Sequence, residues 1–142
     1  MARRTAPPAG TGAPDPATRL AIADRIVDET LAVAAEVGWD GVRLRSVAER
    51  LGIPLSELNT HYRDLDAIAD AWLGRGVAAM LAPPPEGFAD RPAAERVEAV
   101  VLRFLDALAT HRSATAAMVV GKLWPAHPHH WAPLIFNLSR TV

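Results

Sequence analysis

The apolar residues in the first part of the chain recur every three or four positions, which is the spacing of an amphipathic helix. The first such segment runs from about Pro16 to Val37, and its charged residues gather on the opposite face. Its apolar stripe consists of Leu20, Ala23, Val27, Leu31 and Ala34, with Ile26, Thr30 and Val33 beside it. The pattern predicts a long helix that ends at Gly38 and forms the backbone of a small domain.

Two shorter helices are predicted next, from about Leu44 to Leu51 and from about Ser56 to His61, with Gly52 between them. A sharp turn between two short helices often requires a positive φ, which costs glycine little. Ala48, four residues earlier, is small enough to let the following helix approach closely. The segment therefore predicts two crossed short helices, that is, a helix-turn-helix.

A fourth helix is predicted from Leu65 towards Leu81, with Asp64 as its N-cap. Its expected buried line is Leu65, Ala69, Trp72 and Gly76. Gly74 and Gly76 each lower the helix propensity by about 1 kcal/mol relative to alanine. Two interpretations stay open: the glycines make this connecting helix a hinge, or they let another helix pack closely against it.

The second half of the chain predicts further helices after a proline-rich break at residues 83–85. Pro92 starts a strongly amphipathic helix. Its apolar residues are Val97, Val100, Val101, Phe104, Leu105 and Leu108. A helix from about Ser113 to Leu123 is apolar nearly all round, and a last one carries Trp131, Leu134, Ile135 and Leu138. The predicted fold class is therefore all-α.

The composition narrows the class of protein. Half of the 142 residues are apolar, so the chain can bury a real core, as one unit or as a small domain joined to a second helical one. Without cysteine, there is no disulfide framework and no thiolate chemistry. The first sixteen residues contain no apolar run long enough for a signal peptide or a membrane span. These features fit a cytoplasmic protein with a flexible N-terminal tail.

Sequence motifs for chemistry are missing. No Ser-His-Asp ordering, P-loop, Gly-x-Gly-x-x-Gly or pair of catalytic carboxylates is recognisable, so we expect neither an enzyme nor a bound cofactor. His127, His129 and His130 lie within four residues of one another, but the prolines among them splay the imidazoles apart. We therefore expect a polar loop there and no metal site.

One set of motifs resembles the amino-terminal domain of TetR-family transcriptional repressors over roughly Leu20 to Leu81. The motifs are Ala35-Glu36-Val37-Gly38-Trp39, Val47-Ala48-Glu49-Arg50-Leu51-Gly52-Ile53, Leu58, Tyr62 and Leu65-Asp66-Ala67-Ile68. The resemblance implies a TetR-like architecture. A tail (1–16) would precede a helix-turn-helix domain (17–64), a connecting helix (65–81), a proline-rich linker (82–91) and an incomplete helical ligand-binding and dimerisation domain (92–142).

The same resemblance implies a DNA-binding surface. The residues that would face the major groove are Leu55, Ser56, Glu57, Asn59, Thr60 and His61, with Arg43, Arg45 and Arg63 near the phosphates. This chain departs from the family pattern, which commonly has Thr at position 42, Lys at 55, Tyr at 59 and Lys at 65; here these are Val42, Leu55, Asn59 and Leu65. Between Leu20 and Leu81, six arginines stand against ten acidic residues, so the placement of a few arginines must provide any affinity for a duplex.

Large soft and aromatic residues in the second half suggest an effector pocket, because TetR-like folds enclose one there. The candidates are Met80, Phe104, Met118, Trp124 and Trp131. Ordinary core packing explains the same residues and stays open as the alternative.

Three hypotheses for function follow. In the first, a homodimer binds a double-stranded DNA operator as a repressor, and a small apolar effector modulates it. In the second, Gly38-Trp39, the uncharged recognition segment and the stretch from Pro125 to Leu138 resemble the TetR-fold accessory proteins of ubiquinone biosynthesis. Those proteins bind lipid and a partner enzyme and do not bind DNA, which would explain the missing lysines. In the third, it is a helical interaction module that binds neither a small ligand nor DNA.

Overall fold

Residues 15–123, the part of the chain that this computed structural model describes, fold into six α-helices joined by loops and three 3-10 turns. The helices are α1 (Pro16–Val37), α2 (Leu44–Leu51), α3 (Leu55–His61), α4 (Leu65–Met80), α5 (Ala93–Leu108) and α6 (Arg112–Leu123); the turns are η1 (Trp39–Gly41), η2 (Phe88–Asp90) and η3 (Ala109–His111). No strand occurs within these residues, and the all-α prediction is confirmed. The helix predicted around Trp131 and Leu138 lies outside them.

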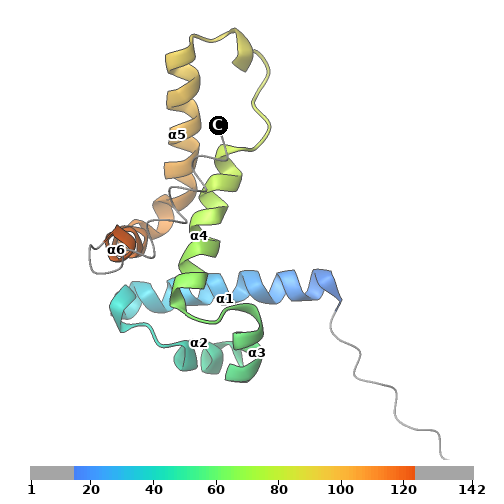
Figure 1. The fold of residues 1–142 in the computed structure, drawn as a ribbon, viewed down its shortest axis with the longest axis vertical. Coiled ribbons are helices and arrows are strands. Elements are labelled where there is room, and N and C mark those ends of the chain that lie inside the picture. The colour runs from blue at the N-terminus through green and yellow to red at the C-terminus, as the bar shows by residue number, and fades with distance from the viewer. Residues whose placement is uncertain (1–14, 124–142) are drawn as a thin grey trace, which may run out of the picture.

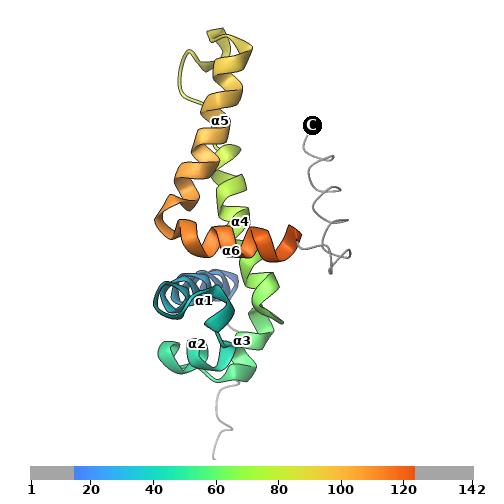
Figure 2. The ribbon, with the colours of Figure 1, turned by 90° about the vertical axis from the view of Figure 1, so that its left-hand side faces the viewer.

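The helices form two parts that share α4. Figure 1 shows α1 lying across the base of the molecule with α2 and α3 beneath it, while α4 rises away and α5 runs back alongside it. Figure 2 shows that α6 then crosses α4 just above α1. α6 contacts α1, η1 and α4, so the second half of the chain closes over the first.

The long first helix begins and ends at recognisable signals. The carboxylate of Asp15 accepts a hydrogen bond from the backbone N–H of Ala17 at 2.8 Å, and Pro16 occupies the first turn. Gly38 ends the helix with a φ of 77°. The predicted stripe is wrong at its start, because Leu20 is 68% exposed. The first turns of α1 project past the helices that cover the rest of it (Figure 1).

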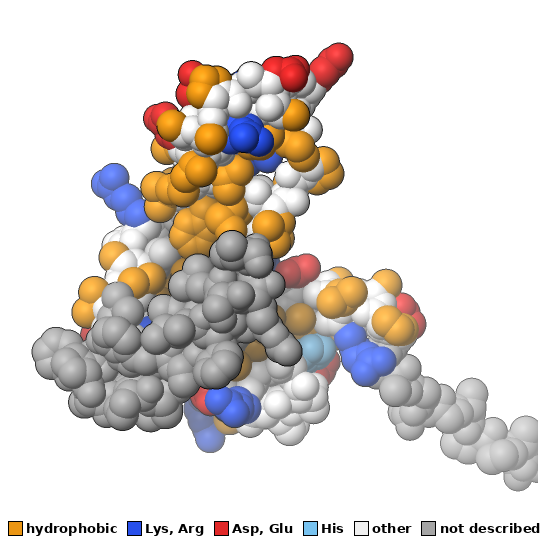
Figure 3. Space-filling view, turned by 45° about the horizontal axis from the view of Figure 1, so that its top comes forward, with side chains coloured by type: hydrophobic (Ala, Val, Ile, Leu, Met, Phe, Trp, Pro, Cys, Tyr) orange, Lys and Arg blue, Asp and Glu red, His pale blue; other side chains and the backbone are white. Residues whose placement is uncertain are grey.

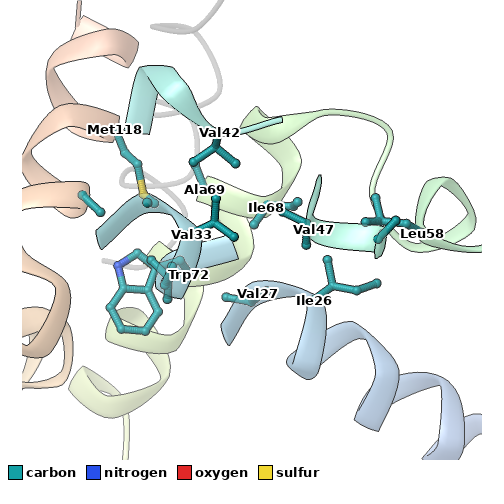
Figure 4. Close-up of a cluster of buried hydrophobic side chains, with 14 of the residues drawn as sticks. Ile26, Val27, Val33, Val42, Val47, Leu58, Ile68, Ala69, Trp72 and Met118 are labelled. Atoms are coloured by element: carbon teal, nitrogen blue, oxygen red, sulfur yellow. The ribbon is translucent and has the colours of Figure 1, made fainter. Parts of the chain in front are cut away.

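The hydrophobic core lies where α1, α2, α3 and α4 meet (Figure 4). Its fully buried side chains include Ile26, Leu31, Val47, Leu58 and Ile68. Burying one such side chain contributes about 1.5–3 kcal/mol relative to leaving it exposed. This core fixes the positions of the two short helices relative to the long one.

The packing of α5 against α4 depends on one glycine. A Cβ placed on Gly76 would lie 2.9 Å from two ring carbons of Phe104 and 3.1 Å from Leu108 Cδ1. A Cβ on Gly74 would meet nothing within 4 Å. For Gly76, the structure supports the close-packing interpretation that the sequence left open.

Much of the apolar face of α5 is not covered. Only Leu108 is buried, whereas Val97, Val101 and Leu105 are 64%, 46% and 53% exposed. Figure 3 shows hydrophobic side chains gathered over this upper arm of the molecule. Among residues 15–123, no helix combines the length and the hydropathy needed to cross a membrane.

Candidate nucleic-acid interface and apolar groove

The turn between α2 and α3 is set by Gly52, which adopts the left-handed conformation with φ 67° and ψ 28°. An added Cβ would meet no atom within 4 Å, so the backbone angle is what requires glycine here. The next backbone N–H, that of Ile53, donates to the carbonyl of Ala48 at 3.1 Å and closes the end of α2. The predicted bend at Gly52 is confirmed.

Helix α3 is anchored by Leu58, which is fully buried, and it presents a polar face outward. Ser56, Asn59 and Thr60 are exposed. The hydroxyl of Thr60 donates to the carbonyl of Glu57 at 2.7 Å, so its lone pairs remain available to a donor outside the helix. These residues form the outward face of the predicted recognition helix.

The other predicted contacts on α3 are less exposed. Glu57 and His61 are half-buried. Leu55 is half-buried against the core, because it lies on the same side of the helix as Leu58. Tyr62, directly after α3, donates its hydroxyl to the carbonyl of Ala23 at 3.4 Å, and burial raises its pKa. These inward contacts hold α3 against α1.

All three arginines that were predicted to reach phosphates are exposed. Arg43 donates through Nη1 to the carbonyls of Asp40 and Val42, both at 2.8 Å. Arg45 has no hydrogen-bond or ion-pair partner among residues 15–123. Arg63, whose side chain is 85% exposed, pairs with Asp64 at 2.8 Å between Nε and Oδ2. An exposed pair of this kind contributes little, so the Arg63 guanidinium can be diverted to another anion.

Asp64 has a second partner that explains its place at the start of α4. Its Oδ1 accepts a hydrogen bond from the backbone N–H of Ala67 at 2.8 Å, as predicted for an N-cap. This bond, with the neighbouring Arg63 guanidinium, lowers the pKa of Asp64. The cap fixes where α4 leaves the three-helix domain.

Two other arginines pair with carboxylates on α1. Arg50 on α2 pairs with Glu29 at 2.6 Å and with Glu36 at 2.8 Å, both on α1. Arg75 on α4 pairs with Asp28 and, at 2.9 Å, with Asp24, also on α1. The charge balance of the segment from Leu20 to Leu81 treats its six arginines alike and does not predict these pairs. The close spacing of acidic residues along α1 was the only signal of them.

An apolar groove of about 410 Å³ lies between α4, α5 and α6. Its walls are formed by Leu73, Phe104, Leu105, Leu108, Ala109, Arg112, Thr115, Ala116, Val119 and Val120. Of the predicted pocket residues, Phe104 lines it. Met80 is half-buried and is not part of the walls. Trp124 and Trp131 lie outside the described residues.

Met118 departs from the predicted pocket. It is only 2% exposed and points into the core of the three-helix domain (Figure 4). The reason is that α6 packs between two regions: Ala114 and Met118 belong to the buried core, whereas Thr115 and Val119 line the groove. For Met118 the core-packing alternative applies.

Polar contacts tie α6 to α4 beside this groove. The indole Nε1 of Trp72 donates to Thr115 Oγ1 at 2.8 Å, and Thr115 donates in turn to the carbonyl of His111 at 3.0 Å. Near the other end of α6, Lys122 pairs with Asp70 at 2.7 Å, and its side chain is 14% exposed. α6 is thus fixed to α4 by hydrogen bonds and charge as well as by apolar packing.

A helix-turn-helix with an outward polar helix, joined by one long helix to a second helical part that carries an apolar groove, defines the structural class. The chain is similar to a solved structure, the TetR transcriptional regulator from Nitrosomonas europaea ATCC 19718. The two are 37% identical in sequence with a TM-score of 0.76, over 84% of this chain and 69% of the other. This chain therefore belongs to the TetR family of transcriptional regulators. No family model and no curated protein matches it.

Proposed function

We propose that this TetR-family regulator is a repressor that binds a double-stranded operator as a homodimer and responds to a small apolar ligand. The observation that carries this proposal is the outward polar face of α3, where Ser56, Asn59 and Thr60 are exposed. Arg43 and Arg45, at the start of α2, are exposed as well. A short helix that is anchored on a well-packed domain and presents a polar face outward has the shape that enters a major groove.

Each group in this surface has a chemical partner on DNA. The Asn59 amide can donate to N7 and accept from the N6 amino group of adenine, and hydroxyls such as that of Ser56 contact several base edges. The carboxylate of Glu57 would accept a hydrogen bond from a cytosine amino group. Elsewhere on the duplex it would be repelled by the phosphates, which carry the same charge. Arg43, Arg45 and Arg63 would contact phosphates, which position the helix without reading the sequence.

The route from ligand to DNA is proposed to run through α6. The groove shares Thr115 with the hydrogen bond to Trp72 of α4, and the next turn of α6 inserts Met118 above α1. A ligand that moves α6 would therefore move α4 relative to the recognition helix. It can change DNA affinity only by its preference for one arrangement over the other.

An electrophoretic shift assay with the region upstream of the protein's own gene tests the proposal. We expect a shifted band at low salt, and about ten-fold weaker binding for Asn59→Ala. The double variant Arg43→Gln, Arg45→Gln should bind more weakly on every sequence and with a shallower salt dependence. Arg91→Gln, an exposed charge far from α3, is the matched control. An intact dimer that shifts no DNA at low salt would contradict the proposal.

A second candidate function is favoured by the charge distribution. Arg50 and Arg75 are held in ion pairs with α1, which leaves few arginines for a duplex in a domain with an acidic balance. A lipid-binding accessory protein of ubiquinone biosynthesis would need no such charge. Native mass spectrometry of the purified protein would then find an isoprenoid lipid or a phospholipid. Lipid-free protein that binds an operator would rule this candidate out.

A further inference from the structure

Arg112 is the charged residue in the wall of the apolar groove. The rest of the wall is apolar except for Thr115, whose hydroxyl already accepts from Trp72 and donates to the carbonyl of His111. Arg112 itself is exposed and has no hydrogen-bond or ion-pair partner among residues 15–123. The groove therefore offers one free polar contact, and that contact is a cation.

The position of Arg112 fixes where a charge would lie. It begins α6, directly after the turn η3 that follows α5, so it stands at the corner between the two helices. From this corner, Leu105 and Phe104 continue along α5, while Val119 and Val120 continue along α6. A ligand with one charged end would place that end at the corner and its apolar part between the helices.

We propose that the ligand of this groove is a free long-chain fatty acid, with its carboxylate on the Arg112 guanidinium and its hydrocarbon chain between α5 and α6. A single unpaired guanidinium matches a single carboxylate, which it can hold through two parallel hydrogen bonds. The volume of about 410 Å³ falls within the range of roughly 300–1,000 Å³ that is usual for small-molecule sites. An uncharged apolar ligand would leave Arg112 without a contact.

This inference rests on the proposed function, because it names the chemical class of the effector. It also assigns a role to Arg112 that apolar packing alone does not require. If Arg112 had no role in binding, its replacement would affect charged and uncharged ligands equally. If it binds a carboxylate, its replacement weakens only the charged ligand. That difference is what the experiment measures.

The test is isothermal titration calorimetry of the lipid-stripped full chain with palmitate, below its critical micelle concentration, and with hexadecanol. We expect saturable binding of palmitate and about ten-fold weaker binding of hexadecanol, since one charge-assisted hydrogen-bonded pair is lost. Arg112→Gln should weaken palmitate binding by about the same factor and leave hexadecanol unchanged. Arg91→Gln is the control with the same change in charge, and Ala116→Phe, which fills the groove, should abolish the binding of both ligands.

Several outcomes would overturn the inference. They are equal affinities for palmitate and hexadecanol, palmitate binding that survives Arg112→Gln, or binding only to phospholipid vesicles. If a second copy of the chain covers the groove instead, palmitate will not bind and Leu105→Glu will dissociate the dimer. The operator shift assay without fatty acid separates the two proposals: DNA binding without palmitate binding refutes only the fatty acid, whereas palmitate binding without DNA binding refutes only the repressor.

Discussion

The two halves of the molecule treat their apolar residues in opposite ways. In the core where α1, α2, α3 and α4 meet, Ile26, Val47, Leu58 and Ile68 are completely buried. On α5, residues of the same kind follow an equally regular spacing, yet Val97 is 64% exposed. Helical periodicity therefore predicts which face of a helix is apolar, but not whether anything covers that face. Most of the buried core lies where α1 to α4 meet, with Leu108, Ala114 and Met118 added from the second half, whereas much of the apolar face of α5 is exposed.

The largest expected difference between the halves is in the cost of removing a leucine. Leu58→Ala should lower the free energy of unfolding by about 2–5 kcal/mol, because it leaves a cavity beneath α3. Leu105→Ala, at a site that is 53% exposed, should change it by only about 0.5 kcal/mol. Urea denaturation followed by circular dichroism measures both. Comparable losses at the two positions would show that α5 is as well covered as the three-helix domain.

The two glycines of α4 provide a matched pair at the boundary between the halves. Gly76→Ala should destabilise the protein by about 1–3 kcal/mol, because its Cβ meets the Phe104 ring. Gly74→Ala, in open space, should stabilise it by up to about 1 kcal/mol through helix propensity. Thermal unfolding of both variants shows whether each substitution raises or lowers the stability of the protein. If both stabilise, α5 does not pack tightly on α4.

The polar link between α4 and α6 gives a smaller expected effect. Thr115→Val keeps the shape of the side chain but leaves the Trp72 indole N–H without its acceptor. The expected loss is about 1–2 kcal/mol, the cost of an unsatisfied, largely buried donor. Thr110→Val, at an exposed position in η3, should be nearly neutral. If chemical denaturation shows the same loss of stability for Thr115→Val and Thr110→Val, the hydrogen bond from Trp72 to Thr115 does not stabilise the packing of α6 on α4.

The smallest effect concerns the N-cap of α4. Asp64→Ala should cost about 1 kcal/mol at neutral pH. The pKa of Asp64 is lower in the folded protein than in the unfolded chain. Its charge therefore stabilises the fold at pH values above the unfolded-state pKa, and this contribution is lost as the pH falls through the folded-state pKa. The gap between wild type and Asp64→Ala should therefore shrink in acid. Asp64→Asn, which keeps an acceptor, should lose less at neutral pH, and a gap that is independent of pH would exclude the charge effect.

Features set by local signals could be predicted from the sequence. The bounds of α1 and α2, the bend at Gly52 and the cap at Asp64 each depend on a few neighbouring residues, and the structure confirms them. α3 begins one residue earlier than predicted, at Leu55. Leu55 packs against the core because of the way in which α3 is oriented on the domain. The residues of α3 alone do not predict that orientation.

Features set by distant contacts could not be predicted. Arg50 and Arg75 could be recognised as structural only once α1 lies beside α2 and α4. The direction of Met118 depends on the crossing angle of α6, and the role of Gly76 depends on Phe104, far along the chain. The exposure of Arg43, Arg45 and Arg63 fits the surface predicted from the sequence, but the ion pairs of Arg50 and Arg75 with α1 could not be foreseen.

The insertion of Met118 into the core beneath α6 bears on the modularity of this regulator. An excised fragment that stopped after α4 would expose a hole at the back of the helix-turn-helix, where the thioether of a residue from the other half normally sits. Joining the helix-turn-helix to a different second domain would require the new partner to supply an apolar side chain of similar size to fill that hole. The helix-turn-helix and the helix that borders the groove are in this sense built as one piece.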